Sequence, residues 1–221
     1  MELSTAVVER RTIRHFKSDP VPEQVIREII EKARWAPSWA NSQPWELYVV
    51  IGDTLERFKQ INRQKYLEGD SHPSEIPMPT EWPDPLKKRV TWVGKSVLES
   101  LSITREDKEK RRRYYGDVHS LLGAPCMILI TLDKGISIEY AMLDVGLFMQ
   151  TFCLLAHEKG LGTSMLAAAV RYPQVSRELL QIPDDQIIII ATALGYPDWD
   201  SPVNHFKRER AELSEFVKWI K

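Results

Sequence analysis

The sequence predicts one domain that mixes helices and strands, of the α+β or α/β class. Its 221 residues are 43% hydrophobic, so one core can be buried within the usual size of a large single domain. Helical and strand-like segments alternate along the chain, but their order does not require a parallel sheet. No internal repeat or low-complexity segment divides the chain. We therefore expect residues 1–221 to form a single domain.

The first third of the chain is expected to hold three helices and a strand. Ser4 suits the N-cap of the first helix, because its hydroxyl can accept a hydrogen bond from a free backbone N–H. Pro22 suits the first position of the second helix, since the N–H that proline lacks is unused there. The spacing of apolar residues predicts helices over 4–9 and from 22 to about 37, a strand over 45–51 and a helix over 54–66.

Residues 66–117 are expected to be an insertion packed over the domain. Five prolines between Gly69 and Pro85 exclude a regular element, so that stretch is predicted to be a loop. Helical spacing resumes at Leu86 and predicts one helix as far as Arg113. The whole region is too short and too polar to build a core of its own.

The second half of the chain contains the most apolar segments. A helix over 139–159 is apolar nearly all round, which indicates a buried helix or one in a subunit interface. Gly160 is expected to cap this helix in the left-handed conformation. Residues 216–220 are apolar enough to dock, as a terminal arm crossing to a partner subunit would. The other predicted elements are a strand over 125–132, a short strand or loop over 160–165, a helix over 173–180 and a strand over 187–194.

The overall charge gives no reason to expect a nucleic-acid or membrane partner. Lys and Arg number 30 against 31 Asp and Glu, a formal net charge of −1. Acidic residues interrupt the basic run 108–113, which precedes Tyr114 and Tyr115, so we interpret it as a solvated helix face. The N-terminus lacks a basic segment before an apolar core, and no run of about 18 apolar residues is present. We therefore expect a soluble, cytoplasmic protein.

The cysteines and histidines do not suggest a reactive site. Cys126 and Cys153 lie in apolar runs, where a reduced and buried thiol is the expected state. The five histidines are scattered without paired spacing, so no metal site is expected. Among them, His157 is interpreted as a structural or surface histidine.

Two segments carry the functional signal, and the first is a cluster of cations. It comprises Arg10, Arg11, Thr12 and Arg14. These cations either complement the C-terminal end of the first helix or grip a phosphate, because a guanidinium group binds phosphate oxygens in pairs. Lys207, Arg208 and Arg210 are candidates for the remaining positive charge.

The second segment, Pro37 to Asn41, is either an ordinary helix stop or a ligand loop. Asn and Ser commonly cap turns. Ser38 and Asn41 also offer short donors and acceptors to a heterocycle or a polyol, while Trp39 offers a flat apolar face. The residues alone leave both interpretations open.

Taken together, these motifs resemble the FMN-dependent nitroreductases. The matching segments occur in the family's order over nearly the whole chain: residues 10–16, 36–38 with 41–45, 160–162 after a long apolar helix, 193–197, and a basic pair near the C-terminus. The resemblance implies an α+β fold of three α/β/α layers around a mostly antiparallel sheet. It also implies an intertwined homodimer with exchanged C-terminal arms and FMN in the interface.

The resemblance assigns roles to individual residues. Arg10, Arg11, Thr12 and Arg14, with Arg208 and Lys207 or Arg210, match residues that hold the phosphate and ribityl chain. Pro37, Ser38, Trp39, Asn41 and Gln43 match a loop that reaches the flavin from the partner subunit. Met165, Leu166, Ala167 and Ala168 match the segment along the flavin ring, where many relatives carry an acidic residue. The insertion is expected to cover the active site, with Trp82, Tyr114 and Tyr115 lining an acceptor pocket.

The implied reaction is a ping-pong hydride transfer. NADH or NADPH reduces the flavin at N5, and a nitroaromatic, quinone or related acceptor then takes the electrons. No side chain is expected to act as acid or base, because the cofactor carries the chemistry. Alternatives on the same fold are reductive dehalogenation, flavin fragmentation and azoline-type dehydrogenation. A non-catalytic FMN-binding module is the alternative from a different class.

Overall fold

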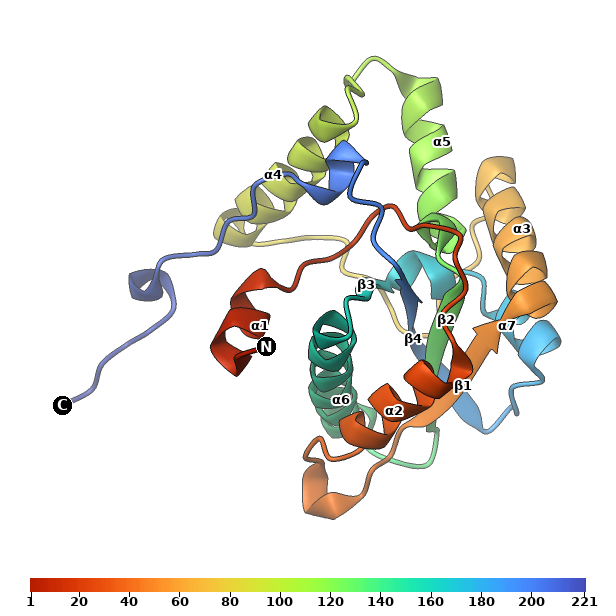
Figure 1. The fold of residues 1–221 in the computed structure, drawn as a ribbon, viewed down its shortest axis with the longest axis vertical. Helices are drawn as coiled ribbons and strands as arrows, with labels where there is room; N and C mark the ends of the chain where they lie inside the picture. The colour runs from red at the N-terminus through yellow and green to blue at the C-terminus, as the bar shows by residue number, and fades with distance from the viewer.

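A four-stranded antiparallel sheet forms the centre of the molecule (Figure 1). The computed structural model describes residues 1–221. The strands are β1 (Glu46–Ile51), β2 (Cys126–Asp133), β3 (Gly162–Leu166) and β4 (Gln186–Gly195), in the order β1-β2-β4-β3. Every neighbouring pair is antiparallel. The predicted α+β class is therefore confirmed, as are the predicted strands.

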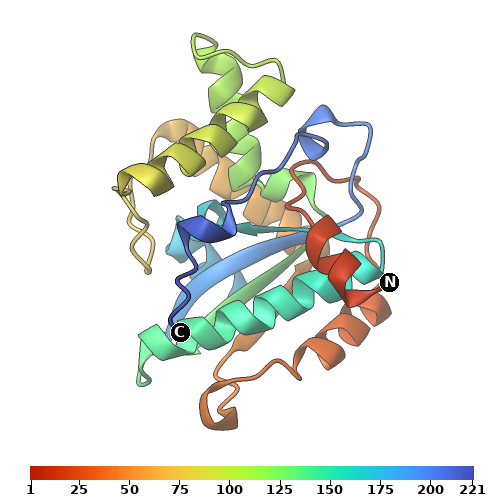
Figure 2. The same ribbon diagram turned by 90° about the vertical axis from the view of Figure 1, so that its left-hand side faces the viewer.

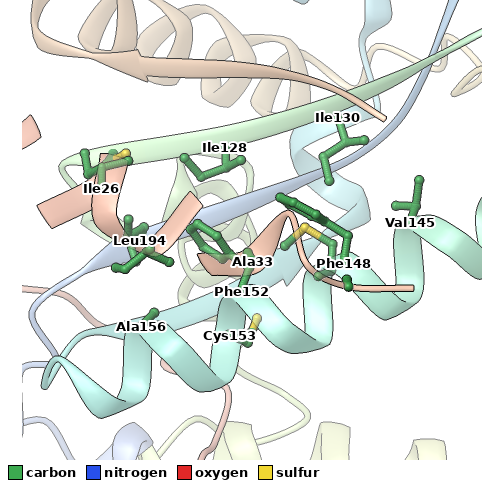
Figure 3. Packing of buried hydrophobic residues seen from close by; sticks show 14 of the residues in the cluster. Ile26, Ala33, Ile128, Ile130, Val145, Phe148, Phe152, Cys153, Ala156 and Leu194 are labelled. Atoms are coloured by element: carbon green, nitrogen blue, oxygen red, sulfur yellow. The ribbon is translucent and has the colours of Figure 1, made fainter. Parts of the chain in front are cut away.

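Helices cover both faces of the sheet and produce three layers (Figures 1 and 2). One face carries α2 (Glu23–Ala33) and α6 (Ile138–Glu158), and the other carries α3 (Gly52–Glu68), α5 (Lys108–His119) and α7 (Pro173–Leu180). Side chains alternate along the central strand β2, because successive strand residues point to opposite faces. Ile128 packs with Phe148 and Phe152 of α6 (Figure 3), whereas Met127 belongs to the core on the α3 side.

The region predicted as one helix over 86–113 is two helices, so that prediction is wrong. α4 (Asp84–Ser100) and α5 are separated by a turn in which Ser102 has a left-handed φ of 54°. The carboxylate of Asp107 closes this turn by accepting the backbone N–H of Thr104 at 3.0 Å. The basic run therefore begins α5 instead of ending α4. As predicted, residues 70–83 form no helix or strand.

The two N-terminal helices begin at other residues than predicted. α1 (Leu3–Glu9) follows Glu2, and no side chain caps it, so Ser4 lies within the first turn. α2 begins at Glu23, and Pro22 is the residue just before it. The end of α6 does follow the prediction. Gly160 has a φ of +75°, and the N–H of Leu161 reaches back to the carbonyl of Ala156 at 2.9 Å.

Helix α6 has one buried face and one open face. This helix is long and apolar enough to cross a membrane by length and composition alone, as are the buried core helices of soluble proteins. Phe148, Met149 and Phe152 fill the core beneath the sheet. On the opposite side Tyr140, Leu143 and Leu147 are exposed. Within one chain α6 is thus half buried, which leaves an apolar surface without a partner.

Candidate functional site

The cationic segment Arg10 to Arg14 lies along the free edge of β3. Thr12 forms a bridge with Thr163, and the backbone N–H of Ile13 donates to the carbonyl of Thr163 at 3.0 Å. The side chain of Ile13 is buried and anchors the segment. The sequence-predicted cations are therefore held at the edge of the sheet, beside the start of β3.

Gly162 permits this close approach. A Cβ at that position would lie 2.4 Å from Cγ1 of Ile13 and 2.9 Å from Cγ of Pro197, both too close for real atoms. Close packing therefore requires a glycine at position 162. This contact explains one glycine of the Gly160-Leu161-Gly162 motif, and Gly160 explains the other through its helix cap.

Arginines join the two ends of the chain at this edge. The Nη1 of Arg11 donates to the carbonyl of Asn204 at 2.5 Å, and its Nη2 donates to that of Phe206 at 3.2 Å. In the opposite direction, Arg208 of the C-terminal segment donates to the carbonyls of Val8, at 2.8 Å, and Arg10. The predicted grouping of the N-terminal and C-terminal cations therefore exists within one chain.

The cluster is short of negative charge. Arg10 makes no side-chain hydrogen bond, and its Nε is buried without a partner. Burial lowers the pKa of Arg208, and the positive charges of Arg11, Arg210 and Arg10 lower it further. Buried guanidinium donors are normally paired, so these observations indicate that an anion belongs here. The donor set suits a phosphate, whose oxygens accept several such bonds.

The remaining predicted cations lie at the rim. The side chain of Lys207 is 86% exposed, and its Nζ is 4.0 Å from Oε1 of Glu209. Arg210 donates to the carbonyl of Glu209 at 2.8 Å and is also exposed. Both are worse placed for an anion than Arg10.

The last two residues of β3 and the two alanines after it form an open, uncharged shelf. Met165 is 47% exposed, and Leu166, Ala167 and Ala168 are half-buried. The next two residues turn inward and are buried, which fixes the shelf to the core. The shelf carries no charged side chain, so a flat apolar ring can lie against it.

Arg14 and Tyr114 face each other in a cavity of about 560 Å³ beside the cationic segment. Burial raises the pKa of Tyr114 to about 12, and burial lowers the pKa of Arg14. The guanidinium of Arg14 also lies 5.1 Å from the ring centre of Phe206, a cation–π contact. Leu101 and Val203 supply apolar walls. Of the three residues predicted for an acceptor pocket, Tyr114 is the one that lines this cavity.

The structure does not bring the other two into the cavity. Tyr115 packs edge-on against Tyr114 with ring centres 5.5 Å apart, and it faces outward. Trp82 precedes α4, whereas Leu101 at the cavity follows it. A helix of that length separates the two by about 25 Å. Within one chain, Trp82 and Tyr114 therefore do not share a pocket.

The loop with Pro37, Ser38, Trp39, Asn41 and Gln43 is a rigid, strained turn. Ala40, Asn41 and Gln43 all have left-handed φ angles, of 48°, 58° and 47°. The hydroxyl of Ser38 holds the turn by accepting the N–H of Gln43 at 3.0 Å. Non-glycine residues in this conformation are costly, and such strain is often found at functional sites.

This loop is attached to the far end of α6. The backbone N–H of Trp39 donates to Asp144 at 3.0 Å, and the ring of Trp39 lies edge-on to Tyr140 at 4.7 Å. Near the other end of that helix, the positive charge of Arg10 lowers the pKa of His157. His157 lies thirteen positions after Asp144, which corresponds to about 20 Å along the helix. One chain therefore does not bring the loop to the cationic cluster.

Two residues that hold the cationic segment and the Trp39 loop in place, Asn204 and Asp144, carry no clear signal in the sequence. Asn204 is buried, accepts the N–H of Arg14 at 2.8 Å and donates to the carbonyls of His15 and Asp198. It fixes the cationic segment to the C-terminal part of the chain. Asp144 fixes the loop. The fold and these contacts define an α+β protein with a cationic cluster at the edge of its sheet, of a composition that suits a phosphate.

Known proteins place this architecture in a family. The nitroreductase family model matches residues 7–196. A 4-nitrobenzoate reductase of Pseudomonas putida is 30% identical over 99% of this chain and 96% of its own, and a nitrobenzene nitroreductase of Ectopseudomonas oleovorans is 30% identical over 96% and 94%. The chain belongs to the nitroreductase family.

Solved structures agree with this assignment. The FMN and NADPH-dependent nitroreductase NfnB from Sphigopyxis sp. strain HMH has a TM-score of 0.95 at 29% identity, over 100% of both chains. The FMN-dependent nitroreductase NfnB from Mycobacterium smegmatis, crystallised with NADPH, has a TM-score of 0.92 at 25% identity, over 99% of this chain and 97% of its own. The three-layer fold is thus the nitroreductase fold.

Proposed function

We propose that this chain is an FMN-dependent oxidoreductase that moves hydride from NAD(P)H to a nitroaromatic, quinone or related acceptor in a ping-pong cycle. The observation that carries the proposal is the unpaired, partly buried Arg10 in the segment that borders the start of β3, the strand whose other end forms the uncharged shelf. A cation cluster next to a flat apolar surface suits a ligand with a phosphate at one end and a ring at the other.

The residues present fit FMN. Arg10, Thr12 and Arg208 would hold the phosphate and ribityl chain, and the shelf from Met165 to Ala168 would support the ring. When bound, FMN supplies a site at N5 that accepts and donates hydride. The chain's own contribution is to bind, orient and shield. Since the shelf has no acidic side chain, we assign no general acid or base.

We further propose that a second copy of this chain completes the site. The open face of α6 carries Tyr140, Leu143 and Leu147, and a second α6 packed antiparallel on it would bury all three. A two-fold axis there would carry the partner's Trp39 loop from one end of α6 to the other, toward Arg10. This arrangement would remove the distance of about 20 Å that separates the Trp39 loop from the cationic cluster within one chain.

The C-terminal arm supports the same assembly. Trp219 and Ile220 are 81% and 91% exposed, which is unusual for large apolar side chains. β1 is an edge strand with Val49 and Ile51 exposed, and a groove separates it from α2. We propose that residues 216–220 of the partner cover this edge, because unprotected edges invite pairing. The cytoplasm suits the two free, buried cysteines.

The acceptor class is proposed from the relatives and from the cavity at Tyr114. The named relatives act on nitrobenzoate and nitrobenzene. Arg14 and Arg113 give the cavity positive charge, while Leu101 and Val203 are apolar. Such a lining suits a small aromatic molecule, including one with a carboxylate.

Anaerobic titration of the purified protein tests the proposal. We expect NADH or NADPH to bleach the flavin absorbance, and 4-nitrobenzoate or a quinone to restore it. A flavin that neither nucleotide bleaches would contradict the reductase and favour a non-catalytic FMN module. Bleaching followed by recovery with a halogenated aromatic alone would favour reductive dehalogenation.

A further inference from the structure

The C-terminal end of α6 holds two buried nitrogen atoms without partners. They are Nε of Arg10 and Nε2 of His157, and neither makes a hydrogen bond within the chain. Leaving a buried polar atom unpaired is costly, so native proteins rarely do so. These two atoms differ from the other unpaired atoms of the chain in lying beside the cationic cluster, where a bound anion would complete both.

Three segments meet at these atoms. His157 lies one turn beyond Cys153 on α6, so the two side chains share a face of that helix. The guanidinium of Arg10 lies near both of them. α1 packs against α6 (Figure 2). The C-terminal segment is bound to the end of α1, because Arg208 donates to the carbonyls of Val8 and Arg10. His157 therefore lies beside the cationic cluster and not on a free surface.

The charged groups that face His157 come from each packed segment. They are Glu9 at the end of α1, Arg10 after it, and Arg208 from the C-terminal segment. Burial lowers the pKa of His157, the carboxylate of Glu9 opposes this, and the two guanidinium groups lower it further. With no anion present, the imidazole is therefore neutral at neutral pH.

We propose that His157 is a phosphate-binding residue that gains a proton when the phosphate of the cofactor binds beside Arg10. This inference rests on the proposed function, because it requires FMN as ligand. A phosphate next to the ring favours the imidazolium by charge attraction and receives a charge-assisted hydrogen bond from Nε2. In its Nε2–H tautomer the neutral ring still donates one hydrogen bond from the same atom.

The proton uptake sets the sign of the pH dependence. Without phosphate the pKa of His157 is lowered, and the phosphate raises it, so binding takes up a proton between the two values. Affinity for FMN is therefore helped by His157 at low pH, and this help is lost as pH rises through the pKa of the bound state. In the ligand-free protein the folded state binds this proton less readily than the unfolded chain does. The free energy of unfolding therefore falls as pH drops below about 6.5, the ordinary pKa of histidine.

Titration of the full-length protein with FMN in phosphate-free buffer, between about pH 6 and pH 8.5, tests the proposal. The variant is His157→Gln, whose amide can donate from the position of Nε2 but does not titrate. We expect FMN to bind the variant about tenfold more weakly than the wild type near pH 6, and within about twofold near pH 8.5. The ionisation of FMN's own phosphate cancels in this ratio, because it affects both proteins equally.

Riboflavin, which lacks the phosphate, separates binding from folding. We expect His157→Gln to leave riboflavin affinity unchanged at every pH. His72→Gln is the matched control, since His72 lies on the exposed loop before α4 and should leave the FMN ratio flat. A ratio for His157→Gln that does not change with pH, or an equal loss of riboflavin, would overturn the proposal. Failure of the wild type to bind either flavin would instead overturn the proposed function.

Discussion

Arg10 and Arg208 lie side by side but differ in what their guanidinium groups already bind. Arg208 donates to two backbone carbonyls and so joins the C-terminal segment to the end of α1. Arg10 has no such partner. The sequence suggests the same role for every cation of the cluster. In the structure, Arg208 uses part of its five N–H donors on these carbonyls and keeps the others for a ligand, whereas Arg10 keeps all of its side-chain donors.

The double variant Arg10→Ala with Arg208→Ala should be purified without yellow colour. It removes two charge-assisted donors to the phosphate, and we expect FMN affinity to fall by on the order of 100-fold or more. Fluorescence titration of FMN measures the loss. Lys207→Ala is the control, because that side chain is 86% exposed, and it should change affinity less than about twofold. Full flavin occupancy in the double variant would mean that the phosphate binds elsewhere.

At this scale the sequence predicts residue types better than residue roles. Runs of arginine and a Ser-Trp-Ala-Asn turn are visible without a structure. Asn204 and Asp144 are not, because their importance depends on backbone groups that are 190 and 105 residues away. The sequence likewise indicates a structural or surface role for His157, since nothing in its neighbours along the chain reveals Arg10.

Among the elements, the N-terminal segment and β3 depend most on each other. They touch through Thr12, Ile13 and Thr163, and Gly162 leaves the space for that contact. The sheet edge is thus both a structural joint and one wall of the proposed site.

Gly162→Ala should destabilise the protein and loosen FMN together. The added Cβ would overlap Ile13, which is buried and cannot move away. Overpacking of this kind costs about 1–3 kcal/mol, which corresponds to a fall in Tm of roughly 2–10 °C in a protein of this size. Thermal unfolding measures it. Gly94→Ala in α4 is the matched control, because nothing lies within 4 Å of its Cβ position, and Tm should hold or rise. Equal Tm values for Gly162→Ala and the wild type would refute the packing argument.

Element prediction succeeds where periodicity is strong and fails where the geometry of a turn or a helix end decides. β2 and β4 are nearly continuous apolar runs, and both lie within one residue of their predicted bounds. The break between α4 and α5 depends on Thr104, Asp107 and the left-handed Ser102, whose local bonds outweigh the helical spacing on either side. The start of α1 at Leu3, without a side-chain cap, has no clear sequence signal either.

In the whole molecule, the two halves of the proposed site lie at opposite ends of α6. Arg10 and the shelf lie near its C-terminal end, and the strained loop around Trp39 lies near its N-terminal end. The open face of α6 and the exposed arm after residue 210 are the surfaces that a second copy would cover. The proposal therefore implies that a single chain is folded but incomplete as a binding site.

The flavin content of a monomeric variant tests this central claim most directly. Leu143→Glu with Leu147→Glu places two charges on the open face of α6, and Ile136→Glu, as exposed as Leu147 but in the turn before α6, is the control. Size-exclusion chromatography with flavin absorbance gives mass and FMN per chain in one run, and circular dichroism checks folding. We predict a dimer with one FMN per chain for the wild type and the control, and a folded, colourless monomer for the double variant. A folded monomer that retains one FMN per chain would contradict the account.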